Sequence, residues 1–128
     1  MDTVGPITLI APAERGSVRL ARILAAGVAA DAGLSIDDTE DLRIAVSELV
    51  ALLVDGLGDV PSSIDVSFHR GAGEVVVEGQ LRAALGGREA AVDDLVLEIL
   101  RVVVDDHSFD AGADGRRFRL VKRTRVTA

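Results

Sequence analysis

Residues 63–81 constrain the fold most, because they have the pattern of a β-hairpin with one apolar face. Ser63–Arg70 alternates between apolar and polar side chains, and Glu74–Leu81 follows after a glycine-containing turn. The apolar positions of the first strand are Ile64, Val66 and Phe68. A sheet that buries one face must be covered on that face, so amphipathic helices elsewhere in the chain have to supply a second layer.

Two helices are predicted before this hairpin and one after it. Glu14–Ala32 has apolar residues at helical spacing, and Gly33 is suited to end it. Ser35–Asp38 has the pattern of a capping box that opens a second helix, which runs to about Leu57. A third helix is expected at Ala91–Asp105. The apolar stripe expected on the first helix is Val18, Leu20, Ala21, Leu24, Ala25 and Val28, and that on the third is Val92, Leu95, Val96, Ile99, Leu100 and Val103.

Three further strands complete the predicted order. Ile7–Ala11 is a short strand, and His107–Ala111 with Arg116–Arg123 forms a second hairpin. The order β-α-α-β-β-α-β-β runs through the 128 residues without a repeat or a linker. We therefore predict one domain over residues 1–128, of the α+β class: a two-layer sandwich of a mostly antiparallel sheet with three helices on one face.

Composition limits the classes of function. The chain has no cysteine, its N-terminus lacks the basic start of a signal peptide, and no apolar run is long enough to span a membrane. We expect a soluble cytoplasmic protein that does not bind a membrane. The net charge of −7 argues against direct nucleic-acid binding. His69 and His107 lie in strand patterns without a third ligand, so no metal site is expected.

The basic residues of the last strand are the exception to this acidic balance. The side chains expected on one side of it are Arg117, Arg119, Arg123 and Arg125, with Phe118 and Leu120 on the other. These arginines fit either a solvated outer sheet face, paired with acids such as Asp65, Glu74 or Glu78, or a surface for an anionic partner.

The second helix contains a motif that resembles a known family. Residues 41–53 read DLRIAVSELVALL, and an earlier Val18-Arg19 pair opens the first helix. With the Ala-Val-Ser-Glu stretch at 45–48, most of the chain resembles the bacterial anti-sigma factor and serine-protein kinase family (RsbW-like), which has the histidine-kinase-like ATPase (GHKL, Bergerat-like) fold. In that family the motif continues to an asparagine that holds Mg²⁺ against ATP, and the glutamate is the proposed general base. Leu52 stands at the asparagine position.

The resemblance implies a damaged nucleotide site. Leu52 offers Mg²⁺ no oxygen ligand. The family's Asp-x-Gly-x-Gly motif is replaced by Val77–Leu81, and Val92 and Asp94 stand where the phosphate loop has glycines. We therefore expect a degenerate member with a reduced ATP lid and no cofactor, in which Glu48 is a relic of the base and Leu52 is ordinary core. Glu48 is then solvated or paired with Arg43 or Arg22.

The alternative is an active ATP-dependent protein serine kinase with non-standard nucleotide contacts. Glu48 would act as its base, Glu78 would lie near adenine, and Gly86 and Gly87 would lie at the phosphates, with Mg²⁺ bound alongside ATP. A third reading is a domain whose partner is a signalling protein unrelated to sigma factors.

Protein partners follow from the same resemblance. Family members are homodimers that hold a sigma factor away from RNA polymerase and are displaced by an anti-sigma antagonist. Arg19 matches the first-helix arginine that contacts these partners, and Arg15 and Arg22 flank it. We expect these three residues to form part of the partner-binding surface, although solvated helix arginines would give the same pattern.

Overall fold

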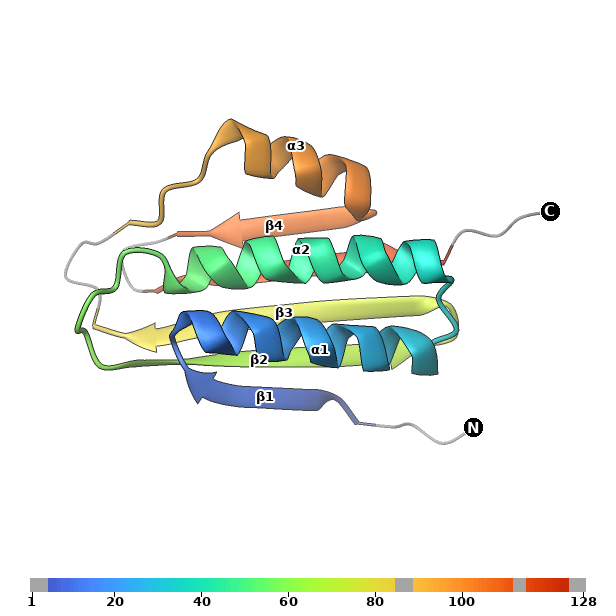
Figure 1. The fold of residues 1–128 in the computed structure, drawn as a ribbon, viewed down its shortest axis with the longest axis horizontal. Helices are drawn as coiled ribbons and strands as arrows, with labels where there is room; N and C mark the ends of the chain where they lie inside the picture. The colour runs from blue at the N-terminus through green and yellow to red at the C-terminus, as the bar shows by residue number, and fades with distance from the viewer. Residues whose placement is uncertain (1–4, 85–88, 112–114, 125–128) are drawn as a thin grey trace.

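The eight elements form in the predicted order. The computed structural model describes residues 5–84, 89–111 and 115–124. The elements are β1 (Ile7–Pro12), α1 (Arg15–Asp31), α2 (Ile36–Val54), β2 (Ser62–Gly71), β3 (Glu74–Ala83), α3 (Asp94–Val103), β4 (Asp106–Asp110) and β5 (Arg117–Arg123), as labelled in Figure 1. None of the helices in these ranges is long and apolar enough to cross a membrane.

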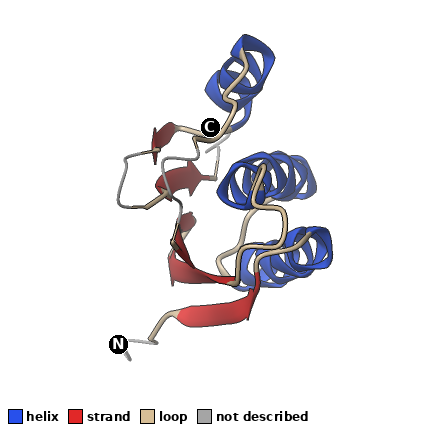
Figure 2. Ribbon diagram, turned by 90° about the vertical axis from the view of Figure 1, so that its left-hand side faces the viewer, coloured by secondary structure: helices blue, strands red, loops and turns tan. Residues whose placement is uncertain are grey.

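The five strands form one antiparallel sheet in the order β1-β2-β3-β5-β4. All three helices lie on the same side of it (Figure 2). The predicted two-layer α+β sandwich is confirmed. The hairpin alternation is also as predicted, since Ile64, Val66 and Phe68 of β2 are fully buried between the sheet and the helices.

Helix α1 buries the predicted stripe except for Leu20: Ala21, Ala25 and Val28 are buried, and Val18 and Leu24 pack against the core. Its buried residues are Ser17, Ala21, Ala25, Val28 and Ala29. Leu20, expected in the core, is 48% exposed. Small side chains on the buried side let α1 approach the sheet and α2 closely, and the bulkier leucine is left at the margin. The predicted end is confirmed, because Gly33 has a φ of 79° and its neighbour Leu34 donates to the carbonyl of Ala29 at 3.0 Å.

Helix α2 is the central helix of the second layer. The predicted cap is present, with Ser35 Oγ accepting a hydrogen bond from the amide of Asp38 at 3.1 Å. The helix ends at Val54 rather than near Leu57, because Asp55 is already extended, with a ψ of 130°, and Gly56 follows at a φ of 65°. Leu57 is still buried, from the loop.

Helix α3 is shorter and less buried than predicted. It begins after Asp93, not at Ala91, and lies beside α2 toward the β4 edge of the sheet (Figure 1). Only Leu100 and Val103 are buried, whereas Leu95 is 66% exposed. The prediction that Leu95 belongs to the core is wrong, because an element at the margin of the layer has neighbours on one side only.

Candidate functional site

Leu52 lies in the core, where the family resemblance implies a metal ligand. Its side chain is 6% exposed and belongs to the main apolar cluster. The prediction that Leu52 is ordinary core is confirmed. Its burial contributes roughly 1.5–3 kcal/mol to the free energy of folding.

Arg116 lies under the C-terminal end of α2 and is 1% exposed. Its Nη1 donates to the carbonyl oxygens of Leu52 at 3.0 Å, Leu53 at 3.2 Å and Asp55 at 2.7 Å. Carbonyls at the end of a helix lack the amides of a following turn. That of Leu52 accepts from the amide of Asp55 at 3.5 Å, and the guanidinium supplies a donor to all three carbonyls and interacts favourably with the negative end of the helix dipole. Burial lowers the pKa of Arg116, and the nearby charge of Asp55 acts in the opposite direction.

Sequence reasoning missed this role of Arg116. The strand alternation held the signal, because Arg117 and Arg119 point outward and position 116 therefore shares the inward parity of Phe118. What the alternation does not specify is the acceptor, since the helix end lies more than sixty residues away along the chain.

The backbone amides at the start of α3 are bound to a carboxylate of the chain itself. Asp93 Oδ1 accepts from the amides of Leu95 at 2.6 Å and Val96 at 3.3 Å. The amide of Ala91 donates to Asp55 Oδ2 at 2.9 Å, which fixes the approach to α3 against the end of α2. Free amides at a helix start attract phosphate, but here an acid already occupies them.

Glu48 lines a polar crevice between α1 and α2. The crevice has a volume of about 240 Å³ and is also lined by Arg22, Ser47 and Ile44. Arg43 pairs with Glu40 at 3.0 Å, not with Glu48. Within the described ranges Glu48 makes no ion pair or side-chain hydrogen bond, so its half-buried carboxylate faces the crevice. The predicted pairing with Arg43 is therefore wrong.

The structure does not bring Glu78 together with Glu48. Glu78 lies on the outer face of the sheet, where its Oε1 is 3.1 Å from His69 Nε2, whereas Glu48 lies on the helical side. Gly79, the residue after Glu78, has a packing role. The ring of Phe118 lies directly over its Cα, so a Cβ at this position would clash with the ring. Gly86 and Gly87 lie outside the described residues.

The outer sheet face carries the exposed arginines of β5. Arg117, Arg119 and Arg123 point outward and Phe118 and Leu120 are buried, as predicted. Arg125 lies outside the described residues. Arg123 reaches Glu74 at 4.0 Å, so one of the predicted cross-strand pairs is present.

Asp65, also on the outer face, pairs with a residue of the neighbouring strand instead of with β5. Its Oδ2 accepts from Arg82 Nε at 2.7 Å and from Gln80 Nε2 at 3.2 Å. The hydrogen bond from Arg82 lowers the pKa of Asp65, partial burial opposes this, and Gln80 adds to the lowering.

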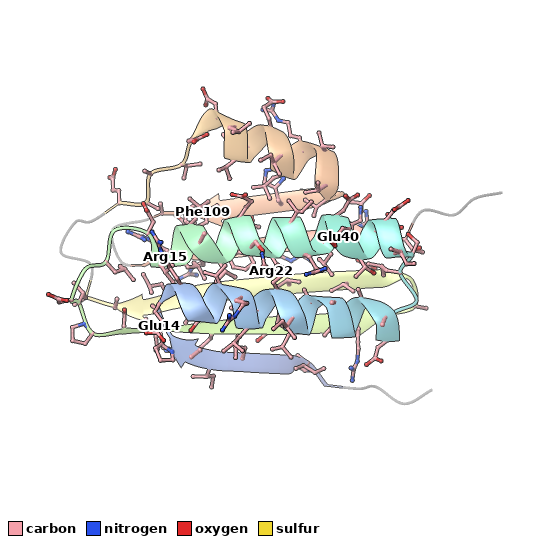
Figure 3. All side chains as sticks on the ribbon, viewed as in Figure 1. Glu14, Arg15, Arg22, Glu40 and Phe109 are labelled. Carbon is pink, nitrogen blue, oxygen red and sulfur yellow. The ribbon has the colours of Figure 1, made fainter. Side chains whose placement is uncertain are left out.

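The three arginines of α1 lie on one side of the helix. Arg15 and Arg19 are exposed and Arg22 is half-buried, and their spacing of four and three residues places them in one stripe. Arg22 points from α1 toward α2 (Figure 3), since it lines the crevice with Ile44 and Glu48. None of the three forms an ion pair within residues 5–84, 89–111 and 115–124. In the same ranges, no group of three or more His, Asp or Glu side chains could hold a metal ion.

Comparison with known proteins relates this arrangement to one family. No protein-family model matches the chain. A stretch of 63 residues is 35% identical to serine-protein kinase RsbW of Halalkalibacterium halodurans, and it covers 49% of this chain and 39% of that protein. The crystal structure of the RsbU and RsbW domains of Rv1364c from Mycobacterium tuberculosis superimposes with a TM-score of 0.68 at 19% identity, over 98% of this chain and 35% of that one. The chain is similar to RsbW in sequence over this stretch.

The chain spans well under half the length of either protein, 39% of that RsbW and 35% of the Rv1364c chain. The structural likeness, at 19% identity, supports the fold, and the sequence match supports the family resemblance.

Proposed function

We propose that this RsbW-like chain is an anti-sigma-factor-like regulator that binds a protein partner and needs no nucleotide to do so. The partner is a sigma factor or an anti-sigma antagonist, and the stripe of Arg15, Arg19 and Arg22 on α1 forms part of the binding surface. The working form is a homodimer in the cytoplasm.

The observation that carries the nucleotide part of this proposal is buried Leu52. A side chain without lone pairs fills the position from which the family resemblance implies a Mg²⁺ ligand. Two neighbouring features support it: the guanidinium of Arg116 already binds the end of α2, and the carboxylate of Asp93 already binds the first amides of α3. A triphosphate would have to displace Asp93 or approach its negative charge.

Calorimetric titration with ATP, in the presence and absence of Mg²⁺, tests this part directly. We expect no heat of binding at high micromolar protein and no thermal shift at millimolar ATP. Saturable, Mg²⁺-dependent binding would show that the interpretation of Leu52 and Asp93 is wrong.

Capture experiments test the partner. The tagged chain is incubated with a panel of sigma factors and anti-sigma antagonists from the host, and we expect one class to be retained. Arg19→Glu should reduce the capture strongly, whereas Arg117→Glu on the outer sheet face reverses a charge of the same kind and should have little effect. Retention of no member of either class would overturn the proposed partner, and sedimentation velocity measures the dimer independently.

One observation favours the kinase as a second candidate. Glu48 has no ion-pair partner in the described part of the chain and faces an open crevice, so its carboxylate remains available as a base. Incubation with Mg·ATP and each captured antagonist, followed by mass spectrometry, tests this candidate. Phosphate transfer that Glu48→Ala abolishes would replace our proposal with the kinase.

A further inference from the structure

The helical side of the molecule has an open apolar groove between α2 and α3. The groove has a volume of about 430 Å³ and is lined by Ile44 from α2 and by Glu98, Ile99, Val102 and Val103 from α3. Val102 is 73% exposed and Leu95, on the same stripe of α3, is 66% exposed. Contiguous exposed apolar side chains of this size cost free energy in water and mark contact surfaces in soluble proteins.

Ile44 joins this groove to the basic side of α1. The same side chain lines the polar crevice that contains Arg22 and Glu48. Arg15 and Arg19 continue the stripe of Arg22 along α1, on the side of that helix turned toward α2. The apolar groove and the polar crevice therefore meet at Ile44, with Arg22 in the crevice and Arg15 and Arg19 farther along α1.

The charges around the groove and the crevice determine which kind of partner segment can bind there. Glu40 is paired with Arg43, and Glu98 with Arg101 at 2.8 Å, so these four residues cancel within their own helices. Among the described residues that line the crevice, this leaves Glu48 and Arg22 without an ion pair, and Arg19 and Arg15, which continue the stripe of Arg22 along α1, add two more unpaired positive charges. A partner segment with acidic residues on the edge that faces α1 complements this surface, and one with basic residues there is repelled.

We propose that the α2–α3 groove binds an amphipathic helix of a protein partner, with its apolar side against Ile44, Ile99 and Val102 and an acidic edge toward Arg22 and Arg19. Two antiparallel helices side by side, as α2 and α3 are in Figure 1, leave a groove that receives a third helix at ordinary packing distances. The inference rests on the proposed function in that the partner is a protein, and it adds the site and the chemistry of the partner segment.

A synthetic peptide tests the inference without knowledge of the natural partner. The chain contains no tryptophan and no tyrosine. The emission of one tryptophan on the apolar side of a helical peptide of about 18 residues therefore reports binding without background. Three peptides are compared: leucines with a glutamate edge, the same leucines with a lysine edge, and the glutamate edge with the leucines replaced by serine.

Val102 and Ile10 have nearly equal exposed fractions, 73% and 72%, so serine variants at these two positions provide a matched control. Val102→Ser alters the groove, and Ile10→Ser alters a side chain that is 72% exposed on the outer sheet face. We expect the glutamate-edged peptide to bind the parent chain and Ile10→Ser alike, and to bind Val102→Ser about tenfold more weakly or worse. Arg19→Glu should weaken it too, and the lysine-edged peptide should bind the parent chain at least about tenfold more weakly.

Several results would overturn the inference. They are no binding of the glutamate-edged peptide, equal binding of the lysine-edged peptide, or equal loss in Ile10→Ser and Val102→Ser. Self-association that Val102→Ser abolishes, without peptide binding, would assign the groove to a second copy of the chain and also overturn it.

The outcome is separable from that of the proposed function. Peptide binding with no capture of any sigma factor or antagonist keeps the groove and rejects the proposed partner. Capture that Val102→Ser leaves unchanged keeps the partner and rejects the groove.

Discussion

Among single residues, Arg116 has a large predicted effect on stability, because one buried guanidinium serves three carbonyls at the end of α2. Removal of the side chain takes this donor from all three carbonyls, of which that of Leu52 keeps the amide of Asp55, and opens a cavity. We predict that Arg116→Ala lowers the free energy of unfolding by about 3–5 kcal/mol, measured by urea denaturation followed by circular dichroism.

Two comparisons separate the causes. Arg116→Met keeps the apolar volume and loses the donors, so its loss should be large but smaller than that of the alanine variant. Arg117→Ala, next in sequence and exposed, should change the free energy of unfolding by no more than about 0.5 kcal/mol. Equal losses of unfolding free energy in the alanine variants at positions 116 and 117 would contradict the role of Arg116 as the donor to the end of α2.

Asp65 gives a prediction about pH. Its pKa is lowered in the folded chain by the hydrogen bond from Arg82, so the ionised form is favoured by folding. The resulting stability is present above the unfolded pKa of about 3.9 and is lost as the pH falls through the lower folded value. Asp65→Asn should therefore be less stable than the parent chain at pH 7, by less than about 1 kcal/mol because Arg82 is largely exposed.

The difference between the two proteins should shrink toward pH 3. Urea denaturation at the two pH values measures it. A difference that grows on acidification would show that Asp65 gains nothing from its ionised form.

At the scale of elements, the start of α3 depends on one cap. The Asp93 carboxylate accepts from two amides of the first turn, and its loss leaves both to water. We predict that Asp93→Ala costs about 1 kcal/mol and speeds hydrogen exchange at Leu95 and Val96. Asp94→Ala changes a neighbouring acid that makes no cap bond and is the control. Unchanged exchange at these two amides would contradict the cap.

The order of the elements was predictable from the sequence, but their depth in the core was not. Hairpin alternation, the Ser35 cap and Gly33 are local signals, and each was confirmed where the structure formed the expected contact. The predictions that Leu20 and Leu95 are buried were wrong, because helical periodicity identifies an apolar face without showing how far neighbouring elements cover it.

The candidate site was predictable to the same extent. Burial of Leu52 follows from its place in an apolar helix, and the outward arginines of β5 follow from alternation. The binding of Arg116 to α2 and of Arg43 to Glu40 depends on side-chain choices among several partners within reach, which spacing alone does not settle.

For the whole molecule, the only lysine of the chain joins three elements. Lys122 of β5 is 3% exposed, and its Nζ donates to the carbonyl of Val103, the last residue of α3, at 2.9 Å. The same Nζ lies 3.5 Å from a carboxylate oxygen of Asp38 and 3.5 Å from one of Asp41, both in the first turns of α2. A buried ammonium is stabilised only by such partners, so this group fixes the sheet, α2 and α3 relative to one another.

Replacement of this lysine should therefore affect more than its own strand. We predict that Lys122→Met lowers the free energy of unfolding by about 3–5 kcal/mol, because the acid of Asp38 stays buried after its cation is removed. Adding Asp38→Asn to Lys122→Met should recover part of the loss, since the second change removes the uncompensated charge. Urea denaturation of the two single variants and the double variant measures the coupling. If the double variant loses as much as the sum of the single variants, the ion pair does not hold the helices to the sheet, and α3 is attached through its apolar side chains, Leu100 and Val103 foremost.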